Sequence, residues 1–124
     1  MYYRILPELK NAVQAGKSKM TVPFSRMDLA ILEILRENGY IKSVHQETVG
    51  KKQVLSVTLP KQKKGSIDFR LLSKPSRRIY SDYRNLHRVR SGYGLGVLST
   101  PAGILSVADA KKKKVGGEYL FEIW

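Results

Sequence analysis

The chain has 124 residues, a length typical of one domain or of two small lobes. Its 23 lysines and arginines far outnumber its 10 acidic residues, which gives a formal net charge of +13. Such an excess favours a polyanionic partner, either nucleic acid or an anionic membrane surface. No apolar run approaches the roughly 20 residues that span a bilayer, and the lack of cysteine excludes a disulfide framework and cysteine-ligated zinc. A cytoplasmic nucleic-acid-binding protein is therefore the leading class.

The positive charge is concentrated in the middle of the chain. Residues 51–90 contain twelve lysines and arginines but only two acids, Asp68 and Asp82. A helix predicted over 25–38 has nearly equal numbers of positive and negative charges. We therefore expect the contact surface on hairpin edges and on the middle linker, and a DNA-binding role for that helix is disfavoured.

The first half of the chain predicts two helices. Apolar residues at helical spacing indicate a helix over 3–15, and Pro7 limits where it can begin because proline is tolerated only in a first turn. The second helix covers 25–38. Ser25, with an aspartate three residues later, makes a capping-box-like start, and Gly39 supplies the C-terminal cap.

Strands lie between and after these helices. A short strand is predicted at 20–22, and three more are predicted at 41–47, 53–59 and 66–72, the last two from alternating apolar residues. The last three form a meander, so we expect an N-terminal α/β lobe with two helices on a three-stranded sheet. The segment Ser73-Lys74-Pro75-Ser76 is a break, which divides the chain into lobes 1–72 and 73–124.

The second lobe is predicted to be mostly β with one or two short helices, so the fold class is α+β. Ser106 can cap one of these helices, and Gly116-Gly117 returns the chain into the last strand. The expected elements are a strand at 78–80, a short helix at 82–89, strands at 95–99 and 104–105, a helix at 107–113 and a strand at 118–123.

A loop in this lobe, Ser99-Thr100-Pro101-Ala102-Gly103, offers two adjacent hydroxyls and free backbone amides. These groups suit the sugar edge of folded RNA because the 2′-OH both donates and accepts hydrogen bonds. The same residues also fit an ordinary β-turn. The run Lys111–Lys114 likewise has two interpretations, a phosphate contact or a solvated helix face. Among the tyrosines, Tyr80 is the one we expect near RNA.

Residue spacing gives no support for catalysis or for a metal site. His45 and His87 have no evident carboxylate partner, so a small basic ribonuclease using either histidine is the weakest alternative. No metal-ligand spacing occurs, and we expect no cofactor. The protein is predicted not to be an enzyme.

The C-terminal block of the chain has a specific pattern. It reads Gly94-x-x-Val97-Leu98-Ser99-Thr100-x-x-Gly103-Ile104-Leu105, followed by Gly116-Gly117-Glu118 and Trp124. This block resembles the second lobe of the ribosomal protein S8 family of the small subunit. Further motifs occur in the order that this family shows: Lys10-Asn11-Ala12, Thr21-Val22-Pro23-x-Ser25-Arg26, Glu37-Asn38-Gly39-Tyr40-Ile41 and Ser73-Lys74-Pro75-x-x-Arg78-Ile79-Tyr80.

The resemblance implies a structural constituent of the small ribosomal subunit. Such a protein is a primary binder of a central-domain helix of small-subunit rRNA, helps to assemble the platform, and works as a monomer beside neighbouring ribosomal proteins. In that family the hydroxyl loop enters the RNA minor groove and the N-terminal lobe grips the backbone. Carried over to this chain, and with the middle segment added, the RNA-binding candidates are Ser99, Thr100, Pro101, Ala102, Gly103, Gly117, Glu118, Lys10, Asn11, Thr21, Ser25, Arg26, Lys74, Arg78 and Tyr80.

Some details depart from the family pattern or stay open. Pro101 and Ala102 stand where a serine and a lysine are common, so one hydroxyl and one charge are lost while proline stiffens the loop. Glu118 either orients the loop or reads a base amino group. A second role, implied by the same resemblance, is repression of translation by binding the protein's own mRNA. A cytoplasmic, ribosome-bound location in a bacterium is expected, because no basic presequence opens the chain, and an organelle is the alternative.

Overall fold

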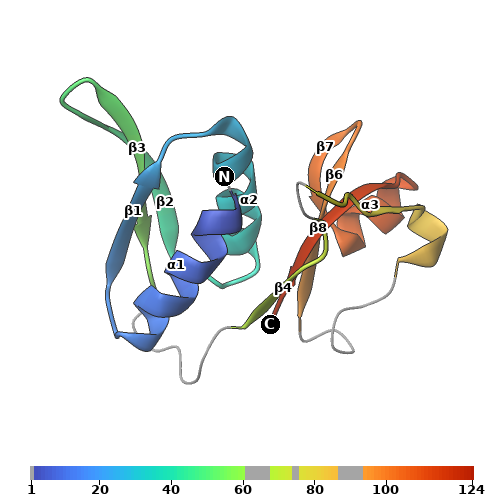
Figure 1. Ribbon diagram of the computed structural model, residues 1–124, viewed down its shortest axis with the longest axis horizontal. Coiled ribbons are helices and arrows are strands. Elements are labelled where there is room, and N and C mark those ends of the chain that lie inside the picture. The colour runs from blue at the N-terminus through green and yellow to red at the C-terminus, as the bar shows by residue number, and fades with distance from the viewer. Residues whose placement is uncertain (1, 61–67, 74–75, 87–93) are drawn as a thin grey trace. The chain divides into compact units, whose positions relative to one another are not determined.

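The computed structural model describes residues 2–60, 68–73, 76–86 and 94–124 (Figure 1). The chain divides into two compact units, residues 1–67 and 68–124, which we call the first lobe and the second lobe. Each lobe has its own antiparallel sheet and at least one helix, so the predicted α+β class is confirmed.

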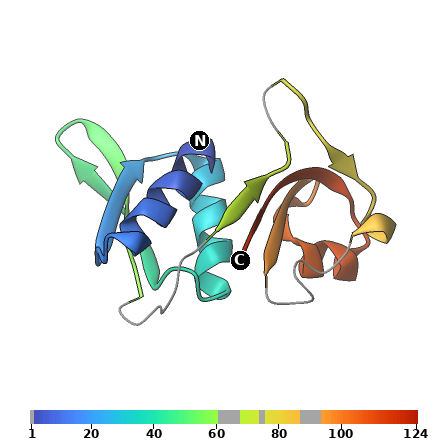
Figure 2. The same cartoon turned by 60° about the horizontal axis from the view of Figure 1, so that its bottom comes forward.

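The first lobe contains α1 (Tyr2–Gln14), β1 (Lys19–Pro23), α2 (Arg26–Glu37), β2 (Ser43–Val49) and β3 (Lys52–Thr58). The strands form an antiparallel sheet in the order β1-β3-β2. Both helices lie on the same side of this sheet (Figures 1 and 2). Val22 of β1 lies opposite Leu55 of β3, and both are buried. The helix-covered face is therefore the apolar one, and the alternate residues point to a face without helices.

The buried side of α1 explains why this helix tolerates a proline in its second turn. The helix begins at Tyr2, so the prediction that Pro7 must lie in the first turn is wrong. A proline at this position removes one helical hydrogen bond. Ile5, Leu6 and Leu9 are each 2% exposed or less. Burial of such side chains is worth roughly 1.5–3 kcal/mol each, which outweighs the lost bond.

The end of α2 matches its prediction, whereas its start differs. Gly39 has φ of +82°, and the amides of Gly39 and Tyr40 bond back to carbonyls of the last turn at 3.2 Å and 2.9 Å. These two bonds form a Schellman motif. Ser25 is the N-cap residue, but its side chain makes no capping hydrogen bond. The Leu29 amide bonds to the Ser25 carbonyl at 2.9 Å, so the backbone starts the helix without the predicted hydroxyl contact.

The second lobe contains β4 (Phe69–Leu71), β5 (Tyr80–Ser81), the 3-10 turn η1 (Tyr83–Asn85), β6 (Leu95–Thr100), β7 (Gly103–Ser106), α3 (Val107–Lys113) and β8 (Gly117–Ile123). Its strands follow the order β4-β8-β6-β7, and β5 also pairs with β8. The long strand β8, red in Figure 2, is therefore the centre of the sheet, because it pairs with β4, β5 and β6.

The strand predicted at 66–72 belongs to the second sheet and not to the first. In β4, Phe69 lies opposite Ile123 of β8, and Asp68 and Trp124 exchange two backbone hydrogen bonds of 3.0 Å. The third strand of the first sheet is β1. Alternation of apolar residues indicates a strand but carries no information about its partner, so this part of the predicted meander is wrong. The two units accordingly divide before β4.

The short helix predicted at 82–89 is not formed in the part of this segment that the structure describes. Only η1 is present, and there the Asp82 carboxylate accepts a hydrogen bond from the Arg84 amide at 3.3 Å. The chain leaves the turn extended at Leu86, with φ −79° and ψ 131°. Leu86 is 2% exposed, so its burial directs the chain into the core. Positions 87–89 lie outside the described residues.

The helix α3 covers one face of the second sheet. Val107 and Ala110 of α3 pack with Leu98 of β6 and with Leu86 in a buried apolar cluster. The Ser106 hydroxyl accepts a hydrogen bond at 3.2 Å from the amide three residues later, which confirms the predicted N-cap. The cluster identifies the face of β6 that carries Leu98 as the covered one.

Candidate nucleic-acid interface

The predicted hydroxyl loop joins β6 to β7. Thr100 lies opposite Gly103 in the strand register. The Thr100 hydroxyl donates to the Gly103 carbonyl at 2.8 Å and accepts from the Ala102 amide at 3.1 Å. Gly103 has φ of +111°, which a residue with a side chain rarely adopts. The Thr100 hydroxyl thus holds the turn closed. The Ser99 hydroxyl, by contrast, has no partner among the described residues and can bind a ligand.

Gly116 and Gly117 allow the start of β8 to approach its neighbours closely. A Cβ atom added at Gly117 would overlap the Ser99 carbonyl oxygen and lie 3.0 Å from Cα of Thr100. A Cβ at Gly116 would lie 2.9 Å from Cα of Asp82. These neighbours are backbone atoms that cannot rotate away. The glycine pair therefore sets the position of the residue that follows it, Glu118.

Three strands bring three of the predicted site residues into one row. Glu118 of β8 lies opposite Ser99 of β6 on one side and opposite Tyr80 of β5 on the other. Directly opposed residues of antiparallel strands point to the same face. Tyr80 is 70% exposed, so its ring is free to stack on a base, while Ser99 and Glu118 are partly buried.

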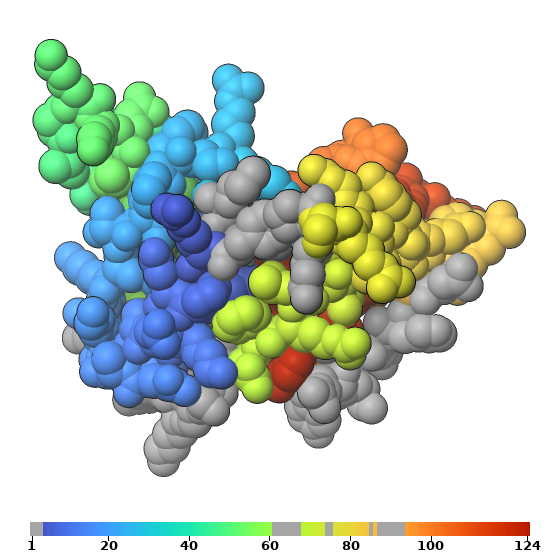
Figure 3. All heavy atoms as spheres, in the orientation of Figure 1, coloured from blue at the N-terminus to red at the C-terminus, as the bar shows by residue number. Residues whose placement is uncertain are grey.

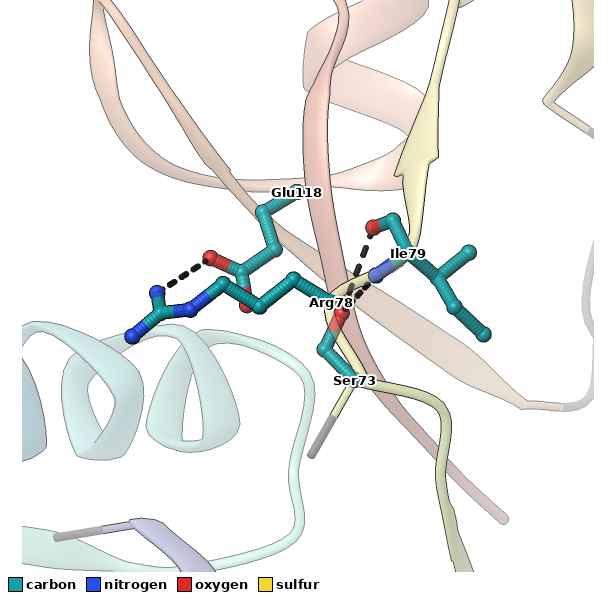
Figure 4. A network of polar contacts seen from close by, with 4 residues as sticks. All are labelled: Ser73, Arg78, Ile79 and Glu118. Carbon is teal, nitrogen blue, oxygen red and sulfur yellow. Dashed lines mark hydrogen bonds and ion pairs between the residues drawn. The ribbon is translucent and has the colours of Figure 1, made fainter. Parts of the chain in front are cut away.

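Arg78 completes this row from the segment that precedes β5. Its Nη1 lies 3.2 Å from Oε1 of Glu118 (Figure 4). The segment 76–82 is at the surface of the second lobe (yellow in Figure 3). We call Ser99, Glu118, Tyr80 and Arg78 the cross-strand site. It offers a hydroxyl, an aromatic face and a guanidinium within one patch, which are groups that bind sugar, base and phosphate.

The lysine run 111–114 extends from the other face of the sheet. Lys111, Lys112 and Lys113 end α3 and Lys114 is its C-cap, and α3 packs on the sheet face that carries Leu98 and its cross-strand partner Tyr119. Ser99 and Glu118, one residue along each strand, point away from that face. Burial raises the pKa of Tyr119. The Glu122 carboxylate accepts a hydrogen bond from the Tyr119 hydroxyl at 3.2 Å and raises that pKa further. The lysines are exposed but do not join the cross-strand site.

The predicted residues of the first lobe are distributed over several elements. Lys10 and Asn11 lie on α1, Ser25 is the N-cap of α2, and Arg26 begins that helix. Thr21 lies on β1, one residue from buried Val22, and so points to the face without helices. Arg26, Asn11 and Thr21 are exposed, whereas Lys10 and Ser25 are partly buried.

Two other expectations concern residues without a role in the cross-strand site. His45 is exposed on β2, and His87 lies outside the described residues. Within the described part of the chain there is no group of three or more histidine, cysteine or acidic side chains that could hold a metal ion. Among the helices in that part, none is long and apolar enough to cross a membrane.

One predicted candidate, Lys74, lies outside the described residues. Its neighbour Ser73 makes contacts that the sequence does not predict. In the sequence, Ser73 is only part of a break between the lobes. It is fully buried, and its hydroxyl bonds to both backbone polar groups of Ile79. Serine is common in breaks of this kind. Its place directly after Leu72, at the end of the predicted strand, gives no signal of burial.

Comparisons with known proteins agree with the residue motifs. The family described as ribosomal protein S8 matches residues 4–124. The small ribosomal subunit protein uS8 of Mycoplasmopsis agalactiae is 39% identical over 122 residues, which cover 97% of this chain and 93% of that protein. The uS8 protein of Kineococcus radiotolerans is 39% identical over 123 residues, with 97% and 93% covered. The uS8c protein of Welwitschia mirabilis is 36% identical over 122 residues, with 97% and 95% covered. Because the match spans nearly the whole chain and both lobes, the chain belongs to the ribosomal protein S8 family.

Proposed function

We propose that this protein, a structural component of the small ribosomal subunit by family, binds small-subunit rRNA directly through the cross-strand site of its second lobe. The observation that carries the proposal is the row Ser99–Glu118–Tyr80 on one sheet face, with Arg78 at its edge. Family membership also favours a structural role over a catalytic one.

The chemistry of the site suits an irregular RNA helix. The hydroxyl of Ser99 and the exposed turn Pro101–Gly103 fit the shallow minor groove, where 2′-hydroxyls are displayed. The exposed ring of Tyr80 suits stacking on an unpaired base, and Arg78 suits a phosphate. We therefore propose recognition of a central-domain helix by shape and by its 2′-OH pattern, early in assembly of the platform.

The first lobe supplies a second proposed contact. Arg26 and Asn11 are exposed, and Lys10 and Ser25 are accessible in part. Together with Thr21 they would meet the phosphate–sugar backbone, although they come from different elements of the lobe. Contacts of this kind position a protein on RNA without reading its sequence.

Location and other partners follow from the same family membership. The protein is ribosome-bound, and we propose the bacterial cytoplasm because most of the named relatives are bacterial. Neighbouring small-subunit proteins are its proposed protein partners. Its own mRNA would be bound wherever it presents the same helix shape to the cross-strand site.

Equilibrium binding tests the proposal. At near-physiological salt, we expect the protein to prefer a central-domain rRNA hairpin over an unrelated hairpin of equal length by ~100-fold or more. Equal affinity for both hairpins, with a steep dependence on salt in each case, would reduce the protein to a non-specific basic binder and contradict the proposal.

The lysine run offers a separate prediction about non-specific attraction. Replacing Lys111, Lys112 and Lys113 with glutamine should weaken binding to both hairpins by a similar factor, because α3 covers the sheet face opposite the cross-strand site and its lysines would contact phosphates without reading that site. The slope of log affinity against log salt should become shallower by about 2, since each lost phosphate contact removes roughly 0.7–0.9. A loss confined to the rRNA hairpin would instead show that the run reads the specific site.

A matched variant controls for total charge. Lys42, Lys51 and Lys52 are exposed in the first lobe, and their replacement with glutamine removes the same three charges. If this variant and the 111–113 variant lose equal affinity, net charge alone accounts for the effect. A larger loss for the 111–113 variant would indicate that α3 lies near the RNA.

A further inference from the structure

A buried serine fixes the backbone from which Arg78 extends. Ser73 is 0% exposed. Its hydroxyl accepts a hydrogen bond from the Ile79 amide at 2.9 Å and donates to the Ile79 carbonyl at 3.2 Å (Figure 4). The same carbonyl accepts from the Tyr119 amide of β8 at 2.8 Å. The Ser73 hydroxyl therefore holds both backbone polar groups of a residue six positions later, and the Tyr119 amide ties that residue to the central strand.

The hydrogen bonds at Ile79 also limit the positions that the neighbouring arginine side chain can occupy. Arg78 precedes Ile79, so its backbone is held by the same bonds. Its guanidinium makes one contact with Glu118, between Nη1 and Oε1 at 3.2 Å. A guanidinium carries five N–H donors, and within the described residues no other group accepts one from Arg78. The remaining donors are available to a ligand.

The pair of charges is asymmetric in its exposure. The side chain of Arg78 is 61% exposed, whereas that of Glu118 is only 13% exposed. The pair therefore presents its positive member to solvent and keeps its negative member covered. Because water screens the largely solvated guanidinium, the pair is expected to add little to stability, and its more direct effect is the orientation that it gives to the guanidinium.

We propose that Ser73 and Glu118 are positioning residues for RNA binding, which together present Arg78 to an RNA phosphate in a fixed orientation beside Ser99. The proposal rests on the proposed function and deepens it. It assigns an acidic side chain on an RNA-binding surface a favourable role, because a guanidinium held in place loses less rotamer freedom when it binds a phosphate.

Removing the negative charge separates this proposal from simple electrostatics. Glu118→Gln should weaken binding to the rRNA hairpin by about fivefold, because the arginine is no longer held. The same variant should tighten binding to the unrelated hairpin by about twofold, because the net charge rises by one. The control is Glu47→Gln, which makes the same charge change at an exposed residue whose side chain has no partner in the described part of the chain. That control should tighten binding to both hairpins slightly.

A double-mutant cycle tests whether Glu118 and Ser73 act through Arg78. Arg78→Gln should weaken binding to the rRNA hairpin by about tenfold, with Arg70→Gln, exposed in the same lobe, as its control. In the Arg78→Gln background, neither Glu118→Gln nor Ser73→Ala should weaken binding further. A merely structural role would leave the single-variant losses unchanged in that background, and this result would overturn the proposal.

The outcomes also distinguish failure of the inference from failure of the proposed function. If the unmodified protein shows no preference for the rRNA hairpin, the proposed function fails. If the preference is present but Glu118→Gln tightens binding to both hairpins, as the Glu47→Gln control does, the inference alone fails. Arg78 is exposed, and Glu118→Gln keeps the size and shape of the side chain, so their cycle decides the matter independently of how well Ser73→Ala folds.

Discussion

Replacing Gly117 with alanine is expected to lower the free energy of unfolding of the second lobe by roughly 3 kcal/mol, the upper part of the range for forced overpacking. The added Cβ would overlap the Ser99 carbonyl oxygen and lie 2.9 Å from the carbonyl carbon of that residue. Since the obstacle is backbone, β8 and β6 must separate and lose hydrogen bonds on either side. Urea unfolding followed by the fluorescence of Trp124, the only tryptophan, measures the change.

Gly103→Ala is the matched control for this change. It makes the same substitution in the same lobe, at a glycine with φ of +111° but with nothing within 4 Å of the added methyl group. Its cost is only that of the unfavourable backbone angle, about 1–2 kcal/mol. An equal loss of stability in the two variants would show that the close approach of β8 to Ser99 is not what requires glycine at 117.

Local features of the fold could be predicted from the sequence because their causes are local. The Schellman motif at Gly39 and the Ser106 cap of α3 involve residues at most five positions apart. Both predictions are confirmed. Adjacent residues likewise predict the loop 99–103. Its Thr100 hydroxyl, however, bonds within the loop, which composition alone does not distinguish from a free hydroxyl.

Features that depend on distant residues were beyond the reach of sequence patterns. The residues of β4 alternate as in any half-buried strand, but their partner, β8, lies about fifty residues later. The contact of Arg78 with Glu118 spans forty positions. The separation of the Arg78–Glu118 pair from the lysine run 111–114 likewise depends on which face of the sheet α3 covers. Only the strand register shows that Ser99, Glu118 and Tyr80 share a face.

The register also changes what is expected of the two loop hydroxyls. Ser99→Ala together with Thr100→Ala should weaken binding to the rRNA hairpin by about 1–3 kcal/mol, the scale of hydrogen bonds lost at a desolvated interface, while the fold stays intact. The two single variants should act differently. Ser99→Ala removes a hydroxyl with no partner in the described part of the chain, so it should leave the free energy of unfolding unchanged and reduce affinity directly.

Thr100→Ala should reduce affinity through the shape of the loop, because it removes the bonds to Ala102 and Gly103 that hold the turn closed. Thr100→Ser keeps the hydroxyl and is the matched control, expected to bind like the unmodified protein. Isothermal titration with the rRNA hairpin, beside urea unfolding of each variant, separates the two mechanisms. Unchanged affinity in Ser99→Ala would remove this hydroxyl from the interface. Equal losses in Thr100→Ser and Thr100→Ala would show that the methyl group of Thr100, and not its hydroxyl, supports binding.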